Sequence, residues 1–409
     1  MSAVAGLRGT GDWGTDERPK NFREMILWRN PNGTAPIFAL MARVQKESTN
    51  DPEFSWWDEP TGILRLQVNG ALSSGDLTVV VDSSDPSATA PGNNWGTAEH
   101  LVTGDLLQVE PAADAATYDD EILEVVSVAS STQFTVKRGR SGTTAAAIAN
   151  NLYLLKIGSA HAEGTASANA ASRNPIKYSN FTQIFKTSYE ITNTAGVTKT
   201  RTGDPVANDK RRKSFDHARD IEQAMLWGAK NETTGANGKP LRTMDGIRSF
   251  VPTNTTTIFG SSTTVSNFLD AVYPVFDYDT PAGDERIGFC GNNGLNILNK
   301  MIQTDSNSQI QWGGVIKQFG MQFREFLMPQ GRLLMRTHPL LNQNSLYRDS
   351  MFIVDFSAMR WRPLVGRDTK MMDNIQNKDE DLRRGQWLTE GGLEVRYGGL
   401  TCGYLGAIQ

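Results

Sequence analysis

The spacing of apolar side chains predicts one long helix over residues 203–231. Asp204 and Pro205 are typical of a helix start, because the carboxylate caps the first turn and the missing N–H of proline is not needed there. Apolar residues then recur at the spacing of a single helical face, at Phe215, Ala218, Ile221, Ala224, Met225 and Ala229. Glycine and asparagine in residues 233–238 indicate the stop. We expect a helix roughly 40 Å long that serves as a support on which other elements pack.

Short β-type runs characterise residues 61–155. They are separated by clusters of Gly, Ser, Asp and Pro, and they occupy residues 64–68, 77–81, 106–109, 122–128 and 134–136. Regular short strands with such turns predict a small all-β barrel or sandwich. This block interrupts the main fold and does not begin it.

An extended antiparallel hairpin is predicted around this block. Residues 51–60 hold Phe54, Trp56 and Trp57, and residues 180–191 form a long β-type run that ends in a turn at 193–196. Adjacent side chains of a strand point to opposite faces, so paired tryptophans need cover on both faces. A two-stranded ribbon is marginal in water and should dock on a partner. Core packing and subunit contact are both open for Trp56, Trp57, Phe181 and Phe185; we favour subunit contact.

The remainder of the chain mixes helices and strands. Helical patterns cover residues 265–273 and 293–302, and strand patterns cover residues 286–290, 321–328, 331–336, 351–355 and 393–405. Without the strict alternation of a doubly wound sheet, this order predicts an α+β fold.

Composition narrows the functional classes. A chain of 409 residues suggests about two or three domains. Cys290 and Cys402 are its two cysteines, too few for a disulfide framework or a cysteine-based zinc site. We expect no membrane-spanning helix and no signal peptide. The net charge of −4 argues against nucleic-acid binding through a basic surface, although a wall that encloses nucleic acid is compatible with it.

Candidates for catalysis and metal binding are weak. Residues 9–14 match G-x-G-x-x-G without a preceding strand, so we expect no dinucleotide site. The acidic run 114–121 lacks the glycine of a helix-loop-helix calcium site, and we expect a solvated loop. Histidines are scattered, and His217 should be partly exposed on the long helix; the four are His100, His161, His217 and His338. We therefore expect no enzyme activity, no cofactor and no metal.

A basic run lies on the long helix, at Lys210, Arg211, Arg212 and Lys213. DNA contact, a solvated face and ion pairs with a neighbouring subunit are the alternatives. We favour carboxylates of an adjacent subunit as the partners.

Ordered motifs in the chain carry a resemblance to a known family. Residues 138–143 read R-G-R-S-G-T at the end of the β-block, residues 161–164 read H-A-E-G, and residues 180–185 read N-F-T-Q-I-F before the long helix. In this order they resemble the SU10-type major capsid proteins of tailed phages, which have the HK97-type shell fold. The resemblance runs from about residue 54 to the C-terminus.

That resemblance implies an architecture and a structural role. The expected parts are an N-terminal arm (1–50), an extended loop region (51–202) with the β-insertion at about 61–155, a spine helix and peripheral domain (203–260), an axial domain (261–350) and late strands (351–409). The implied function is self-assembly into hexamers and pentamers of an icosahedral head around double-stranded DNA, in the virion and assembled in the host cytoplasm. Portal and scaffolding or decoration proteins would be partners. The alternatives are an encapsulin-type nanocompartment shell and a phage tail or decoration protein.

Overall fold

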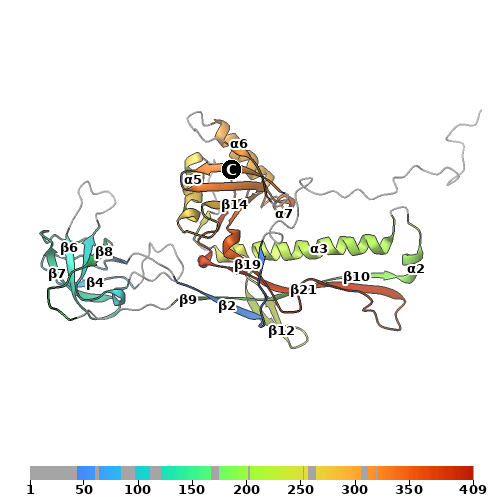
Figure 1. Ribbon diagram of the computed structural model, residues 1–409, viewed down its shortest axis with the longest axis horizontal. Coiled ribbons are helices and arrows are strands. Elements are labelled where there is room, and N and C mark those ends of the chain that lie inside the picture. The colour runs from blue at the N-terminus through green and yellow to red at the C-terminus, as the bar shows by residue number, and fades with distance from the viewer. Residues whose placement is uncertain are drawn as a thin grey trace, which may run out of the picture.

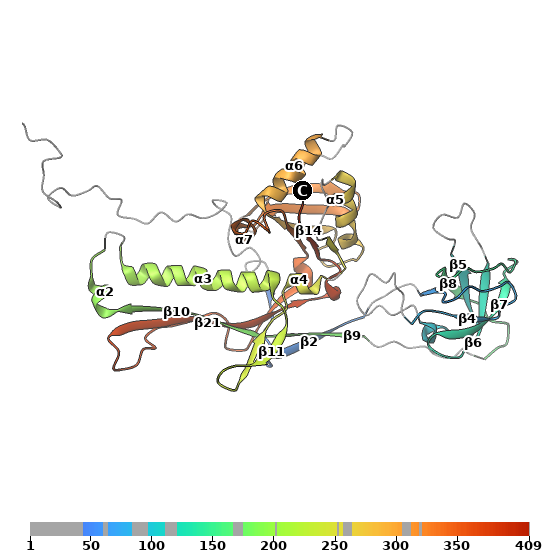
Figure 2. The ribbon, with the colours of Figure 1, turned by 180° about the vertical axis from the view of Figure 1, so that it is seen from behind.

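The computed structural model describes residues 44–59, 64–83, 97–110, 121–166, 175–200, 203–251, 253–256, 264–304, 312–318 and 321–408. Most of the expected N-terminal arm lies outside these residues. Figures 1 and 2 show a small β-domain at one end, a long helix lying along a ribbon of strands, and a mixed α/β part packed on the same helix. Within the described ranges, no helix is both long enough and apolar enough to cross a membrane.

The β-domain is a six-stranded sheet in the order β3-β8-β5-β6-β7-β4. Its elements are β3 (Arg65–Gln67), β4 (Thr78–Val80), η1 (Ala98–His100), β5 (Asp105–Val109), β6 (Ile122–Val128), β7 (Gln133–Arg140) and β8 (Tyr153–Ser159). An antiparallel bridge between Val68 and Val81 joins the two edge strands. Alternate side chains fill the interior, where Leu66, Leu107 and Phe134 are fully buried. The predicted small all-β domain is confirmed, with β8 as an additional strand.

A two-stranded ribbon carries this domain. β2 (Glu53–Asp58) and β9 (Ile176–Phe181) are antiparallel, in a register that pairs Glu53 with Phe181 and Asp58 with Ile176. The whole β-domain lies between these strands in sequence, so the ribbon forms its stem. A hairpin with an inserted domain is therefore present as predicted, but its second strand is 176–181 and not the predicted run 180–191.

A second sheet lies beneath the long helix. β10 (Gln183–Thr192) pairs along its full length with β21 (Leu382–Val395). The sheet is completed by β1 (Gln45–Lys46), β19 (Met359–Pro363) and β20 (Lys370–Met372). After α2 (Asn193–Val197) the chain reverses into α3 (Pro205–Trp227), which runs back over β10 and β21 (Figure 1). Asp204 caps α3 by accepting a hydrogen bond from Val206 N over 2.9 Å, as predicted.

A seven-stranded sheet organises the α/β part, in the order β13-β22-β18-β14-β17-β16-β15. Its strands are β13 (Thr255–Thr256), β14 (Glu285–Cys290), β15 (Trp312–Gln318), β16 (Met321–Met328), β17 (Gly331–Thr337), β18 (Met351–Val354) and β22 (Gly403–Leu405). One face, including Phe289, shares a core with Ile221 of α3. The opposite face packs on α5 (Val265–Val272) and α6 (Asn292–Thr304) through Phe268 and Leu298. The α+β class is confirmed.

Smaller elements complete the fold. They are β11 (Asn231–Thr234), β12 (Pro240–Thr243), α4 (Ile247–Phe250), η2 (Tyr273–Phe276), α7 (Pro339–Gln343), η3 (Phe356–Ala358) and η4 (Tyr397–Gly399). The long helix ends at Trp227, so its predicted end at residue 231 is wrong. β11 begins at Asn231 and forms a hairpin with β12, and the predicted stop at 233–238 lies in this hairpin.

Some predicted boundaries are wrong. The run 180–191 is two strands, because the chain changes sheets at the buried Thr182. The expected turn at 193–196 is the short helix α2. The expected strand 393–405 is broken after Val395, where Tyr397 and Gly399 adopt positive φ values of 58° and 74°. Positive φ is incompatible with a continuous strand.

Candidate assembly surfaces

The stem formed by β2 and β9 has one covered face and one open face. Phe54 and Trp56 are 4% and 8% exposed, and the Trp56 ring lies 5.8 Å from the ring of Phe250. Trp57 points to the opposite face, where it is 61% exposed and pairs across the strands with Lys177. The chain itself therefore covers the first face of this ribbon, and a large aromatic side chain is left on the second.

Asn180 fixes the root of the stem to two distant segments. Its side-chain nitrogen donates to Leu393 O over 2.6 Å and to Asp245 O over 3.2 Å. Its side-chain oxygen accepts from Asp245 N over 2.9 Å. Asn180 is fully buried, so these bonds satisfy polar groups that have no access to water. The stem thus leaves the body at a defined point.

The next residues of the N-F-T-Q motif extend this polar attachment. The hydroxyl of Thr182 donates to Glu390 over 3.3 Å, and Glu390 also forms an ion pair with Arg367. The side-chain oxygen of Gln183 accepts from Met244 N over 3.1 Å. The motif therefore has a structural use: it anchors the point at which the chain leaves the stem and enters the β10–β21 sheet.

His217 connects α3 to both strands beneath it. Its Nδ1 lies 3.1 Å from the hydroxyl of Thr187 on β10, and its Nε2 lies 2.8 Å from the hydroxyl of Thr389 on β21. The Thr389 hydroxyl donates to Thr369, so it accepts from the Nε2–H of His217. Burial lowers the pKa of His217, partly opposed by Asp220. The expectation of a partly exposed His217 is wrong, because the side chain is 2% exposed.

One turn further, α3 makes a second buried polar link. His338 Nε2 lies 3.2 Å from the carboxylate of Glu222, and His338 Nδ1 accepts from Leu340 N at the start of α7. Both side chains are almost completely buried. Polar side chains therefore connect the helix to the β10–β21 sheet and to the α/β part. The helix is the support on which both pack, as predicted. Sequence reasoning missed Glu222 and His338 as partners, because they are far apart in the chain.

The four residues of the basic run on α3 differ in their surroundings. Lys210 forms an ion pair with Asp373 over 2.9 Å, and the Tyr189 hydroxyl donates to the same carboxylate. Burial and this carboxylate raise the pKa of Tyr189 to about 12. Arg211 is exposed, with its guanidinium 5.9 Å from the Phe215 ring. Arg212 is also exposed, while Lys213 is half-buried.

The predicted contacts between subunits remain predictions for all of these residues. For Phe181, which is half-buried, the ammonium group of Lys230 lies 4.5 Å from the ring centre. Phe185 is 7% exposed and belongs to the core that includes Ile221 and Met225 of α3. Of the aromatic set, Trp57 therefore offers the largest exposed fraction to a neighbour.

The R-G-R-S-G-T motif stabilises the β-domain from within. Arg138 pairs with both carboxylate oxygens of Glu121, over 2.6 and 2.7 Å, and donates to Ser73 O over 2.9 Å. Burial opposes the charge of Glu121, but hydrogen bonds from Arg138 and from the backbone of Ala146 and Gly139 keep its pKa below the usual value. The expected solvated loop at 114–121 is wrong for Glu121, which is 1% exposed; residues 114–120 lie outside the described residues.

Other candidates for chemistry do not converge in the described part of the chain. His100 lies on η1 and the exposed His161 follows β8, both in the β-domain, whereas His217 and His338 are buried beside α3. Among the described residues, no group of three or more His, Cys, Asp or Glu side chains could hold a metal ion. The glycine motif at residues 9–14 lies outside the described residues.

Comparison with known proteins identifies the family of this chain. The family model for the SU10 major capsid protein matches residues 6–405. The major capsid protein of Pseudomonas phage PaMx41 is 28% identical over 411 aligned positions, covering 98% of this chain and 92% of that protein. Among solved structures, the capsid of Myoviridae phage XM1 is similar at a TM-score of 0.43 and 8% identity, over 95% of this chain and 96% of the other. The SrpI encapsulin of Synechococcus elongatus PCC 7942 is similar at a TM-score of 0.38 and 8% identity, over 57% and 75%. Because the family match spans nearly the whole sequence, this chain belongs to the SU10 major capsid protein family.

Proposed function

We propose that the chain self-assembles into hexamers and pentamers that form the icosahedral head of a phage and enclose double-stranded DNA. Family membership supports the role of major capsid protein over that of a nanocompartment shell. The proposed location is the virion, after assembly in the host cytoplasm. Portal and scaffolding or decoration proteins are the proposed further partners.

The observation that carries this proposal is the stem of β2 and β9. Its strands pair only with each other among the described residues, and a two-stranded ribbon is marginal in water. Trp57 leaves a large apolar surface open on it. Contact with a neighbouring subunit would stabilise the ribbon and bury that ring, since buried aromatic side chains dominate interface energetics.

Charged residues on α3 supply the other proposed contacts between subunits. Arg211 and Arg212 are exposed on α3 and Lys213 is half-buried, and we propose that carboxylates of an adjacent subunit contact this part of the basic run. The net charge of −4 suits a wall that encloses DNA without holding its phosphates, because basic surfaces bind phosphate through counterion release. We also propose that the chain is divided into an N-terminal arm, an extended loop region, a peripheral domain and an axial domain.

Expression of the chain, imaged by electron microscopy, tests the proposal. We expect closed shells or rings of five and six subunits. Trp57→Asp should reduce the assembled fraction at least about tenfold, since a charge would have to be buried at the contact, while the circular dichroism spectrum stays unchanged. Trp57→Phe is the matched control, because it keeps an apolar aromatic ring at the contact and should leave assembly intact. A monodisperse monomer from the unsubstituted chain under all assembly conditions would contradict the proposal.

A further inference from the structure

Two exposed lysines lie on the face of the β10–β21 sheet that points away from α3. Thr187 bonds to His217 of α3, so the next residue of the strand, Lys186, points to the opposite face. Leu388 of β21 lies directly between Lys186 of β10 and Lys370 of β20. Both lysines are exposed, and their Cα atoms are two strand spacings apart, about 10 Å. This open face therefore carries two neighbouring positive charges.

Neither lysine has a partner in the single chain. Among the described residues, neither forms a side-chain hydrogen bond or an ion pair. Glu190 and Arg384, on the same face, pair with each other over 2.6 Å. Ile184 and Met372 add apolar surface to this face, at 48% and 37% exposure. The face therefore fits a partner that is acidic and also has exposed apolar side chains.

The β-domain has the opposite charge. Residues 61–166 contain twelve Asp and Glu but five Lys and Arg, although the two classes are almost balanced over the whole chain. All five of these basic residues form ion pairs within the domain. Within its described part, the carboxylates of Asp82, Glu99 and Glu163 form no ion pair with Lys or Arg. The domain therefore keeps unneutralised negative charge on its surface.

Asp82, Glu99 and Glu163 lie at one end of the β-domain, which we call the acidic end. The backbone N–H groups just before Asp82 and Glu99 both donate to the β6–β7 turn, at residues 131–132. Glu163 follows β8, whose last residues pair with the start of β5, and β5 starts beside the end of β6. Ile157 of β8 is 46% exposed near the same end. The acidic end thus combines negative charge with exposed apolar surface.

The acidic end of a chain is directed away from the lysines of the same chain. The stem and the β10–β21 sheet extend in opposite directions from their junction (Figures 1 and 2). The buried core of the β-domain consists of its own residues, without a contribution from the body. A second copy must therefore supply the acidic end that reaches this sheet face. Contact between two different surfaces of successive copies is head-to-tail, the kind of contact that closes into rings.

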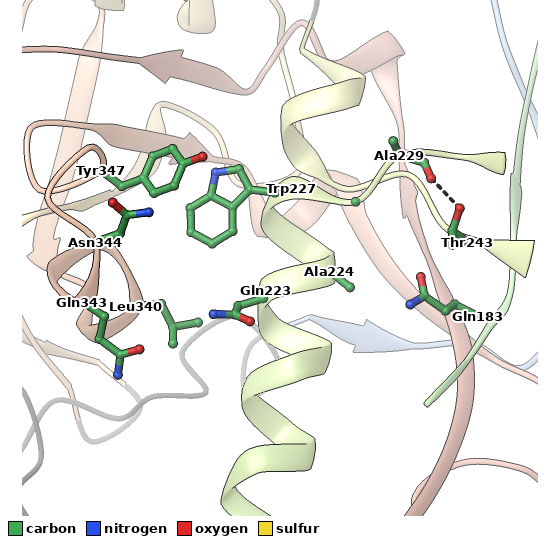
Figure 3. A pocket seen from close by; sticks show the side chains of 11 residues that line it. Gln183, Gln223, Ala224, Trp227, Ala229, Thr243, Leu340, Gln343, Asn344 and Tyr347 are labelled. Atoms are coloured by element: carbon green, nitrogen blue, oxygen red, sulfur yellow. Dashed lines mark hydrogen bonds between the residues drawn. The ribbon is translucent and has the colours of Figure 1, made fainter. Parts of the chain in front are cut away.

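The groove beside the C-terminal end of α3 is a poorer match for an acidic partner. Figure 3 shows the side chains that line it, among them Gln223, Gln343 and Asn344, and none of these lining residues is charged. A carboxylate would lose hydration in this groove without gaining a positive charge nearby. Charge complementarity therefore favours the sheet face.

We propose that the acidic end of the β-domain of one copy docks on the sheet face that carries Lys186 and Lys370 in the next copy. This contact rests on the proposed assembly into rings, and it assigns the inserted domain a role there. The carboxylates of the acidic end would neutralise the two lysines, and apolar side chains of both surfaces would be covered.

Zero-length crosslinking of particles assembled from the full-length chain tests the proposal. A water-soluble carbodiimide joins an amine to a carboxylate that is in contact with it. Particles formed from a mixture of isotope-labelled and unlabelled chains distinguish links between copies from links within one chain. We expect mixed-isotope peptide pairs in which Lys186 or Lys370 is joined to Asp82, Glu99 or Glu163. The absence of such pairs, or links of these lysines only to other carboxylates, would overturn the proposal.

Charge reversal measures the contribution of the contact to assembly. Lys186→Glu with Lys370→Glu should lower the assembled fraction at least about tenfold, because like charges would then face each other. Lys199→Glu with Lys239→Glu is the matched control, since both lysines are exposed on other elements and the charge change is the same. An equal loss in the control would overturn the proposal.

A compensating substitution separates this contact from a general effect of charge. Adding Asp82→Lys, Glu99→Lys and Glu163→Lys to the reversed lysines should recover most of the assembled fraction, and no recovery would overturn the proposal. Protection of both lysines from acylation in DNA-filled but not in empty particles would assign the face to DNA and would also overturn it. Failure of the unsubstituted chain to assemble would contradict the proposed function together with this contact, whereas assembly without the expected crosslinks would overturn the contact alone.

Discussion

The side-chain amide of Asn180 donates to the main-chain carbonyl of Leu393 over 2.6 Å, and thereby joins two strands 213 positions apart in the sequence. This bond lies where the stem leaves the body, and Asn180 also binds both backbone groups of Asp245. The direction of the stem, and hence the position of Trp57 and of the β-domain, depends on this buried attachment.

Asn180→Ala should destabilise the unassembled subunit by about 2 kcal/mol, because it leaves buried backbone groups of Leu393 and Asp245 without partners. Urea unfolding measures the change. Asn231→Ala, at an exposed position of β11, should change stability by less than about 0.5 kcal/mol. Equal effects of the two substitutions would contradict the anchoring role of Asn180.

Gly392→Ala should disturb the same junction sterically. A Cβ at Gly392 would lie 2.4 Å from Phe181 O and 2.7 Å from the Phe54 ring, so the strands would have to separate. We expect a loss of about 2 kcal/mol in urea unfolding. Gly158→Ala on β8 is the control, because its Cβ would meet no atom within 4 Å. An unchanged stability of Gly392→Ala would show that this close approach is not required.

The elements that could be predicted from the sequence are those marked by local signals. Helix α3 was predictable because Asp204, Pro205 and the apolar spacing are local signals, and the alternation at Trp56 and Trp57 identified β2. The SU10-type resemblance is confirmed by the family match. Strand β21 was missed over most of its length, because glycines at 385, 391 and 392 interrupt its pattern.

The reason for those glycines is tertiary. A Cβ at Gly391 would lie 2.5 Å from the Trp361 ring, and one at Gly385 would lie 2.5 Å from the Tyr189 ring. Aromatic rings of distant segments occupy the space, and single-sequence patterns carry no information about them. The burial of His217 and Glu121 was missed for the same reason, since Thr187, Thr389 and Arg138 are brought to them by the fold.

The Arg138–Glu121 pair should be essential to the stability of the β-domain. Arg138→Met leaves a buried carboxylate without its partner, which costs about 3–5 kcal/mol. Protease resistance of the β-domain and its hydrogen exchange measure the loss. Adding Glu121→Leu should recover a large part of it, because the unpaired charge is then removed. A double variant as unstable as the sum of both single losses would contradict this coupling.

His217 should make stability depend on pH. Because burial lowers its pKa in the folded protein, the unfolded chain binds the proton more readily below about pH 6.5. The free energy of unfolding should therefore fall as the pH decreases from about 7 toward the pKa of the folded state. His217→Gln should flatten this part of the profile, and His161→Gln, at an exposed position, should leave it unchanged. An equal slope in the His217 variant would exclude this histidine as the source.

The surroundings of Trp57 in an assembled particle test the central claim most directly. A cryo-electron microscopy map of particles formed by this chain would show each stem of β2 and β9 and its neighbours. The account predicts that a neighbouring subunit covers the Trp57 ring, which is 61% exposed in the single chain. Particles in which Trp57 faces solvent in every subunit, or the absence of any ring or shell, would contradict it.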